Sequence, residues 1–243
     1  MEEHVYPHMY RIEKEHWWFA ARQKILLHYI TSRITTSKET RVLDVGCGTG
    51  AILELFSRRF QAYGTDFSPQ AIEFCRQRGL THLFLGSLAD YPRTERFDLI
   101  TILDVVEHVE DDGGLLAHAH ALLNDHGYLL IAAPAFPFLW SKHDVVLHHK
   151  RRYTRRSLRA VVAAAGFEIE HLTFFNTFLF PVALAKRLVA RLTGSDKAND
   201  LEIPPAPLNV ALRNIFALES DILPHVSLPF GLSLLCLARR RGA

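Results

Sequence analysis

Three closely spaced glycines after a short apolar run constrain the fold of this chain more than any other feature. The run is predicted to be a strand over 41–46, and Gly46, Gly48 and Gly50 lie at its junction with a predicted helix over 49–58. Because glycine has no Cβ, this turn can adopt positive φ angles and its backbone can approach a ligand closely. The helix directs its first free N–H groups back at the turn. Strand, glycine loop and helix together predict a binding site for a nucleoside cofactor.

The same alternation of strand and helix continues along most of the chain. Ser68 and Pro69 are typical of a helix start, and Gly79 suits the end of that helix. Repeated strand–helix units are typical of a parallel sheet with helices on both faces. We therefore expect an α/β fold with a Rossmann-like, doubly wound sheet of seven strands. The expected strands are 41–46, 61–66, 82–86, 98–103, 127–133, 167–174 and 232–238, and the helices between them are 49–58, 69–78, 112–123 and 154–165.

One acid lies where a cofactor's sugar is expected. Asp66 ends the second predicted strand about 20 residues after the glycine loop, the place for a carboxylate that accepts ribose hydroxyls. Gly46-x-Gly48-x-x-Ala51 also satisfies the relaxed dinucleotide fingerprint, which accepts alanine at its last position. The glycine loop alone therefore leaves the choice between nucleoside cofactors open.

The composition is that of an ordinary globular protein, with 49% apolar and 22% charged residues among 243. A net charge of +2 is too small to argue for nucleic acid, so no such partner is expected. Three cysteines, Cys47, Cys75 and Cys236, have neither disulfide nor zinc-site spacing, which favours a reducing compartment. Neither an apolar leader nor a stretch of about 18 apolar residues occurs, so we expect a cytoplasmic location. The oligomeric state stays open.

Three motifs resemble those of one enzyme family. The pattern Asp44-x-Gly46-x-Gly48-x-Gly50 resembles motif I of the class I S-adenosylmethionine-dependent methyltransferases. Residues 97–109 resemble the family's fourth strand and its following D-x-x-E-H turn, and residues 127–134 resemble its fifth strand. The resemblance implies an enzyme that transfers a methyl group from S-adenosylmethionine. A nicotinamide-dependent oxidoreductase and a non-catalytic module that binds S-adenosylmethionine remain as alternatives.

The resemblance also suggests how the chain is organised. In that family the last two strands form an antiparallel hairpin, whereas about fifty residues separate them here, too many for a hairpin loop. We therefore expect a mostly parallel sheet with an antiparallel last strand and a helical insertion before it. The insertion would have two helical segments around a flexible centre at 193–200 and a stiff segment at 203–207. The four expected parts are an N-terminal helical lid at 1–36 with a helix from 7 to 30, a cofactor-binding core at 37–175, a helical cap at 176–228 and the last strand at 229–243.

The resemblance assigns cofactor-binding roles by position. It implies that the main chain of Gly46 and Gly48 lies against the methionine end of S-adenosylmethionine, where Asp44 would hold the ammonium group. Asp66 would accept the ribose hydroxyls, and Phe67 would lie beside the adenine. The other residues expected at the cofactor are Cys47, Gly50, Ser87, Leu88 and Asp104.

Two of these positions have a second interpretation. Cys47 lies inside the glycine loop, where filling of the core is the favoured role. Ser87 follows the third strand at a place where the family often has an acid that reads the adenine amino group. A serine there can form a hydrogen bond but supplies no charge, and Asp90 is the alternative.

The segment from Asp104 to His108 ends the fourth strand, where open α/β sheets place their ligands. Three interpretations compete. Glu107 and His108 could orient the turn by hydrogen bonding, while Asp104 lines the cofactor pocket. His108 could instead be a general base, because an imidazole titrates near neutral pH. Finally, all three could hold a divalent ion, because their spacing resembles the acid-x-x-Glu-His site of the ubiquinone-pathway O-methyltransferases. Mg²⁺ prefers oxygen ligands, so the imidazole weakens this interpretation, and we predict no bound metal.

Aromatic and basic residues predict the site of the methyl acceptor. Six Lys and Arg residues and no acids lie between 148 and 159, at a helix N-terminus where cations are unfavourable, which favours recognition of an anionic substrate. His143 is a second candidate base. Trp17 and Trp18 would either enclose the substrate or hold the leading helix against the sheet. The expected acceptor-site residues are Trp17, Trp18, Trp140, Arg151, Arg152 and Tyr153.

The helix expected over 177–192 has an apolar first half and a basic second half that contains Lys186, Arg187 and Arg191. This asymmetry suits a helix at a membrane surface, and equally a dimer contact, an apolar lid or simple core packing. Peripheral membrane contact through 176–192 therefore remains open. The arginine cluster and the apolar cap together favour a small or lipid-like methyl acceptor. We expect the methyl group to be transferred in line to an oxygen atom of that acceptor.

Overall fold

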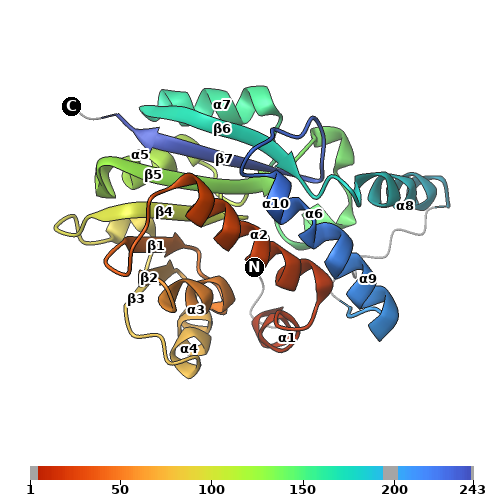
Figure 1. Cartoon of the computed structure of the whole chain (residues 1–243), viewed down its shortest axis with the longest axis horizontal. Helices are drawn as coiled ribbons and strands as arrows, with labels where there is room; N and C mark the ends of the chain where they lie inside the picture. The colour runs from red at the N-terminus through yellow and green to blue at the C-terminus, as the bar shows by residue number, and fades with distance from the viewer. Residues whose placement is uncertain (1–4, 194–201, 242–243) are drawn as a thin grey trace.

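The fold is built on one seven-stranded sheet, shown in Figure 1. The computed structural model describes residues 5–193 and 202–241. Its strands follow the order β3-β2-β1-β4-β5-β7-β6, and β7 runs antiparallel to both neighbours while the other pairs are parallel. The expected seven-stranded sheet with an antiparallel last strand is confirmed. The strands are β1 Arg41–Val45, β2 Gln61–Asp66, β3 Leu83–Leu85, β4 Phe97–Leu103, β5 Leu123–Pro134, β6 Phe167–Phe175 and β7 Ser233–Arg240.

Helices cover both faces of this sheet, each over its own apolar cluster. Alternate residues of β4 belong to the two clusters, because successive side chains of a strand point to opposite faces. One cluster contains residues of α2, α3, α4 and α9, and the other contains residues of α5 and α7. The helices are α1 Val5–Ile12, α2 Trp17–Arg33, α3 Ala51–Ser57, α4 Pro69–Gln77, α5 Asp112–Leu122, α6 Lys142–Val146, α7 Arg155–Ala164, α8 Phe180–Thr193, α9 Ala206–Ala217 and α10 Glu219–Ile222, with short 3-10 turns η1 Leu88–Asp90 and η2 Pro137–Leu139.

The N-terminal helix differs from the single helix expected over 7–30. It is broken between α1 and α2, where the Glu13 side chain accepts a hydrogen bond from the Thr49 hydroxyl and His16 caps the start of α2. Three buried residues of α2, Ile25, Leu26 and Tyr29, belong to the core. This helix is therefore a layer of the sheet packing, and the break before it contacts the glycine loop through Glu13 and Thr49.

The long insertion between β6 and β7 is helical, as expected. Its helix α9 packs on α2, and Asn209 accepts a hydrogen bond from the Trp17 N–H and donates one to the Glu15 carbonyl. The buried carboxylate of Glu219 accepts three main-chain N–H groups from residues 176–178. Figure 1 shows α8 at the margin of the molecule. Of the centre expected to be flexible, residues 194–200 lie outside the described residues.

None of the helices that the structure describes is both long enough and apolar enough to cross a lipid bilayer.

Candidate active site

The glycine loop after β1 has the backbone that its sequence predicts. Gly46, Gly48 and Gly50 have φ angles of 69°, 55° and 84°, and the N–H groups of Gly46 and Cys47 donate to the Thr65 carbonyl on β2. A Cβ on Gly46 would lie 2.5 Å from Val105 Cγ2, so that position must be glycine. A Cβ on Gly48 would meet no atom of the described chain within 4 Å. Val105 therefore fills the space beside Gly46, whereas the space beside Gly48 is free of described protein atoms.

Asp66 lies at the end of β2, facing this loop. Its carboxylate accepts the N–H groups of Gly48 and Ser68, each at 2.9 Å. Burial raises the pKa of Asp66, and the hydrogen bonds from Ser68 and Gly48 partly offset that effect. The next side chain, Phe67, is 69% exposed. An anchored carboxylate beside an exposed aromatic ring suits a ligand that has both a sugar and a flat base.

Two acids and one arginine lie at the ends of β1 and β4. The buried Asp44 carboxylate accepts the Thr101 hydroxyl at 2.6 Å. Its pKa is raised to about 7 by burial, while Thr101 and the Arg22 guanidinium act in the opposite direction. Arg22 Nη2 lies 2.6 Å from Asp104 Oδ2, and Asp104 itself has a φ of 58°. Arg22, which comes from α2, is thus the cation facing these two acids.

Arg22 was not predicted from the sequence. Arg22 lies four residues after Trp18, and its guanidinium carbon lies 4.9 Å from the centre of the Trp18 ring. Arg22 is only 7% exposed, and its Nε has no hydrogen-bond partner among residues 5–193 and 202–241. A buried, unpaired guanidinium N–H beside an acid pair suits a ligand with both a carboxylate and an ammonium group.

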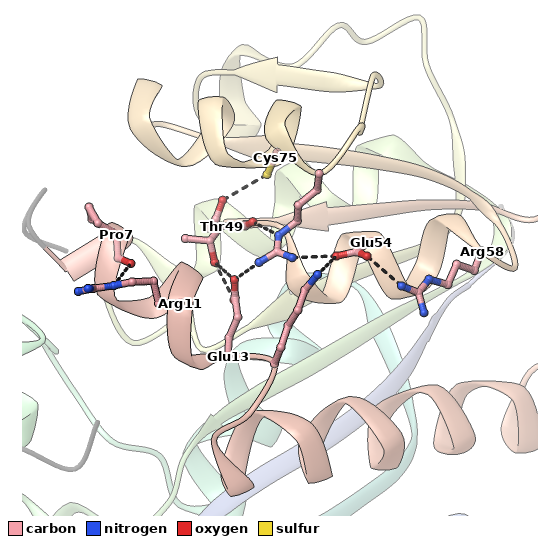
Figure 2. Close-up of polar contacts among 10 residues, drawn as sticks. Pro7, Arg11, Glu13, Thr49, Glu54, Arg58 and Cys75 are labelled. Carbon is pink, nitrogen blue, oxygen red and sulfur yellow. Dashed lines mark hydrogen bonds and ion pairs between the residues drawn. The ribbon is translucent and has the colours of Figure 1, made fainter. Parts of the chain in front are cut away.

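The loop side of the site is fixed by a network that we call the clamp, made of Glu13, Thr49, Glu54 and Arg78 (Figure 2). The Thr49 hydroxyl donates to Glu13 at 2.7 Å, and Arg78 Nε donates to the Thr49 carbonyl at 2.7 Å. The Arg78 guanidinium also pairs with Glu13 and, at 2.8 Å, with Glu54. The clamp therefore ties the break between α1 and α2 to the glycine loop and to α4's C-terminal end.

A second polar group, which we call the imidazole cluster, consists of Glu107, His108, Asp144, His149 and Arg152. Asp144 is fully buried and accepts Arg152 Nε at 2.7 Å and Arg152 Nη2 at 3.0 Å. His149 Nδ1 lies 2.9 Å from Asp144 Oδ1, and its Nε2 lies 3.9 Å from Glu107 Oε1. The rings of His108 and His149 are 4.7 Å apart. The cluster joins the turn after β4 to the segment between α6 and α7.

The electrostatics of the imidazole cluster are set by burial and by its ion pairs. Burial and the nearby Asp104 raise the pKa of Glu107 well above its usual range. Burial together with His149 lowers the pKa of His108 to about 4. Burial alone would raise the pKa of Asp144, but hydrogen bonds with His149 and Arg152 outweigh it and hold that pKa well below normal.

A family model described as a methyltransferase domain matches residues 18–172. The chain belongs to the class I S-adenosylmethionine-dependent methyltransferases. It is 30% identical over 158 residues to a ubiquinone biosynthesis O-methyltransferase of Azorhizobium caulinodans, a match that covers 56% of this chain and 61% of the relative. The match thus spans less than two thirds of that relative's length.

Solved structures share the fold of this methyltransferase. One is an S-adenosylmethionine-dependent methyltransferase from Archaeoglobus fulgidus, with a TM-score of 0.59, 20% identity and coverage of 94% of this chain and 97% of that one. Another is the N-methyltransferase NodS from Bradyrhizobium japonicum in complex with S-adenosylhomocysteine, with a TM-score of 0.56, 13% identity and coverage of 95% and 90%. The family match decides against the nicotinamide-dependent alternative.

The residues of the methyltransferase fit its cofactor. Asp44 and Arg22 can hold the ammonium and carboxylate groups of the methionine end, the open side of Gly48 leaves room for the main chain to approach it, and Asp66 can accept hydroxyls. Cys47 is buried and its Sγ lies 3.8 Å from that of Cys75.

The residues expected around the adenine are divided between two environments. Ser87 donates its hydroxyl to Asp90 Oδ2 at 2.5 Å, closing the turn η1, so Asp90 holds Ser87 in place. Leu88 is buried in the core cluster of α5 and α7. Phe67 alone among these presents a large exposed surface.

The arginines expected to bind an anionic substrate have partners within the protein. Arg152 is buried against Asp144, and Arg151 Nη1 lies 2.9 Å from Asp112 Oδ2. The buried Tyr153 hydroxyl also donates to Asp112, at 2.7 Å. Three of the six cations at 148–159, Lys150, Arg151 and Arg152, thus pair with acids outside that segment.

The remaining expected residues come from α2, from the segment after η2 and from α6. Trp17 packs edge-on against Phe216 of α9, with ring centroids 6.1 Å apart. Trp140 is half-buried after η2, and His143 is half-buried on α6 with its ring 6.4 Å from that of His149. The structure thus brings His143 and His108 to the same group of imidazoles.

Proposed function

We propose that this methyltransferase transfers the methyl group of S-adenosylmethionine to an oxygen atom of a small acceptor. The observation that carries the proposal is the placing of buried Asp44 and of the Arg22–Asp104 ion pair beside an open glycine loop. The likeness to a ubiquinone biosynthesis O-methyltransferase supports oxygen as the methylated atom.

The chain's own residues act mainly by positioning. The sulfonium of S-adenosylmethionine is already activated, so alignment of acceptor and methyl group supplies much of the acceleration. Asp44, Arg22 and Asp66 would fix the two ends of the cofactor. The clamp holds the end of α1 and the glycine loop together.

A hydroxyl acceptor must also lose a proton. Of the two histidines expected as bases, His108 packs against His149 within the imidazole cluster, whereas His143 lies on the outer helix α6. We propose His143 as the base, with Trp140 and Trp18 bounding the acceptor. The test is the pH profile of methyl transfer by the His143→Gln variant.

The acceptor is proposed to be amphiphilic, and α8 is proposed to contact a membrane surface. The described part of α8 exposes Val182 at 65%, together with Leu188 and Val189, close to the exposed cation Lys186, while Arg187 donates to the Leu139 carbonyl. Apolar residues beside cations suit anionic headgroups. No nucleic-acid partner is proposed, and three free cysteines support activity in a reducing compartment such as the cytoplasm.

Two measurements test the proposal. Isothermal titration should show tight binding of S-adenosylmethionine and of S-adenosylhomocysteine, and none of NAD; the reverse preference would overturn it. Release of S-adenosylhomocysteine is then measured with catechol as a probe acceptor. Metabolite mass spectrometry on cells with and without the protein should reveal the natural acceptor by the mass of one added methylene group.

A further inference from the structure

Two buried cysteines meet at the glycine loop. Cys47 lies within the loop and Cys75 lies on α4, and their sulfur atoms are 3.8 Å apart. We propose that these two thiols are a redox modification site: oxidation by hydrogen peroxide joins them in a disulfide, and the disulfide weakens the binding of S-adenosylmethionine. The inference depends on the cofactor of the family and not on the proposed acceptor.

Two glycines leave room for the pair. A Cβ on Gly50 would lie 2.8 Å from Cys75 Sγ, and a Cβ on Gly64 would lie 3.0 Å from Cys47 Sγ. Each sulfur therefore packs against main chain where a larger residue would push it away. The third cysteine, Cys236, lies on β7, which β4 and β5 separate from β1 in the sheet. The fold thus brings one pair of thiols together and keeps the third apart.

The reduced pair is part of the hydrogen bonding of the loop. The Cys75 thiol lies 3.3 Å from the Gly48 carbonyl and donates to it. Its sulfur can then accept the hydrogen of Cys47. Oxidation removes both hydrogens, so the Gly48 carbonyl loses this donor. The loop therefore differs in its contacts between the reduced and the oxidised state.

The new bond also requires movement of the loop. A disulfide bond is about 2.05 Å long, so the two sulfurs must approach by about 1.8 Å. Cys75 is fixed in a helix, whereas Cys47 lies between two glycines with positive φ angles. Gly48 follows directly, and its N–H donates to the Asp66 carboxylate at 2.9 Å. Movement of Cys47 toward α4 disturbs Gly48 and Asp66, which are groups that fit the cofactor.

The chemistry balances with hydrogen peroxide as the oxidant. Cys47 is 8% exposed and Cys75 is 0% exposed, so Cys47 is the thiol that reacts first. Its sulfur takes one oxygen from the peroxide, which gives a sulfenic acid and one water. The Cys75 sulfur then attacks the sulfenic sulfur, the S–S bond forms, and a second water leaves. Two electrons pass from the two thiols to the O–O bond of the peroxide.

The rate of this oxidation should depend on pH. A hydrogen bond to Cys75, together with burial, raises the pKa of the Cys47 thiol. The thiolate is the reactive form, so oxidation should be slow at neutral pH and should become faster as the pH rises. A reversible disulfide also agrees with a reducing compartment, where such bonds are usually transient and redox-sensing.

The first test needs no variant. The whole protein is treated with hydrogen peroxide, digested with trypsin and analysed by mass spectrometry without reduction. Cys47 lies in the peptide 42–58 and Cys75 in the peptide 60–76, so the disulfide should join these two peptides. Bound S-adenosylhomocysteine should slow the reaction. Oxidation of Cys47 to a sulfinic acid without the joined peptide, or equal rates with and without the ligand, would overturn the proposal.

The second test measures cofactor binding in the two redox states. Peroxide treatment should weaken the binding of S-adenosylhomocysteine to the parent by about tenfold or more, and dithiothreitol should restore it. Cys47→Ser should bind the ligand equally before and after peroxide. Cys236→Ser, which removes the cysteine on β7, is the matched control and should lose affinity as the parent does. Equal affinity of the oxidised and reduced parent, or an equal loss in Cys47→Ser, would overturn the proposal.

Discussion

The clamp and the imidazole cluster are both buried polar networks, yet they differ in how their charges are balanced. In the clamp, Arg78 contacts two acids and a carbonyl, so its guanidinium lies among acceptors on several sides. In the imidazole cluster, Asp144 and Arg152 satisfy each other, but Glu107 keeps an oxygen without a partner anywhere in residues 5–193 and 202–241.

This difference separates structural from functional polar groups. A network whose groups are all paired resists change and holds elements together, as the clamp holds α1 to the glycine loop. An unpaired buried carboxylate destabilises the fold unless something else binds it. The comparison therefore predicts opposite responses when single charges are removed.

The largest effect is expected in the clamp. Arg78→Met removes the cation between Glu13 and Glu54 and should lower the free energy of unfolding by about 3–5 kcal/mol, because it leaves buried acid without its partner. Urea unfolding measures this. Arg58→Ala is the control, since Arg58 pairs with the same Glu54 from an exposed position and should cost less than about 0.5 kcal/mol. Equal losses would mean that the clamp is not a buried unit.

The next prediction compares the loss of unfolding free energy when Glu13 of the clamp or Glu107 of the imidazole cluster is replaced by glutamine. Glu13→Gln should lower the free energy of unfolding by about 1.5–3 kcal/mol, because it weakens charge-assisted hydrogen bonds from Thr49 and Arg78. Glu107→Gln, measured in the presence of a chelator, should cost nothing or stabilise by about 1 kcal/mol, because a neutral amide replaces a buried carboxyl that lacks a partner on Oε2 and whose ionisation burial opposes. A loss at Glu107 as large as that at Glu13 would contradict the distinction between the networks.

The contrast also shows what the sequence could predict. The glycine loop and Asp66 depend on spacing within one strand–helix unit, so their positions followed from the sequence. Glu13 contacts residues that follow β1 and α4, and Arg22 contacts Asp104 after β4, all of them more than thirty positions away in the sequence. Local patterns contain no information about such contacts.

The same limit explains the arginine run at 148–159. No acid occurs in that segment, which favoured an external anion. Its acids come from outside it: Asp144 lies on the preceding helix and Asp112 opens α5. The sequence also contains nothing that predicts which of His143, His148 and His149 contacts a buried carboxylate. In the structure it is His149, whose Nδ1 lies 2.9 Å from the buried Asp144.

A smaller effect on the free energy of unfolding is expected from Asp44, and its size depends on pH. Burial raises its pKa from an ordinary value near 3.8 to about 7, so the folded state binds a proton that the unfolded state has released. Its contribution to stability is therefore present below about pH 4 and is lost as the pH rises through about 7. Unfolding of Asp44→Asn should show less decline over that range.

The same carboxyl links cofactor binding to protons. An ammonium group beside Asp44 favours its ionised form, so binding near pH 6.5 should release protons, as shown by titration in buffers of different ionisation enthalpy. Asp44→Asn should abolish the release and weaken binding by about tenfold, or about 1.5 kcal/mol. Proton release that persists in the variant would assign it to another group, such as Asp66.

The smallest change in stability is expected at the open side of the glycine loop. Gly48→Ala adds a methyl group that meets no described atom within 4 Å, so only the left-handed backbone at φ 55° opposes it, at about 1 kcal/mol. Its main effect should be on cofactor affinity, because the methyl group enters the space left for the ligand. Gly46→Ala is the matched comparison: its Cβ would lie 2.5 Å from Val105, so it should lose more stability at a similar φ. Thermal unfolding with and without S-adenosylhomocysteine separates the two effects. Normal stabilisation of Gly48→Ala by that ligand would show that the cofactor does not approach the loop at this position.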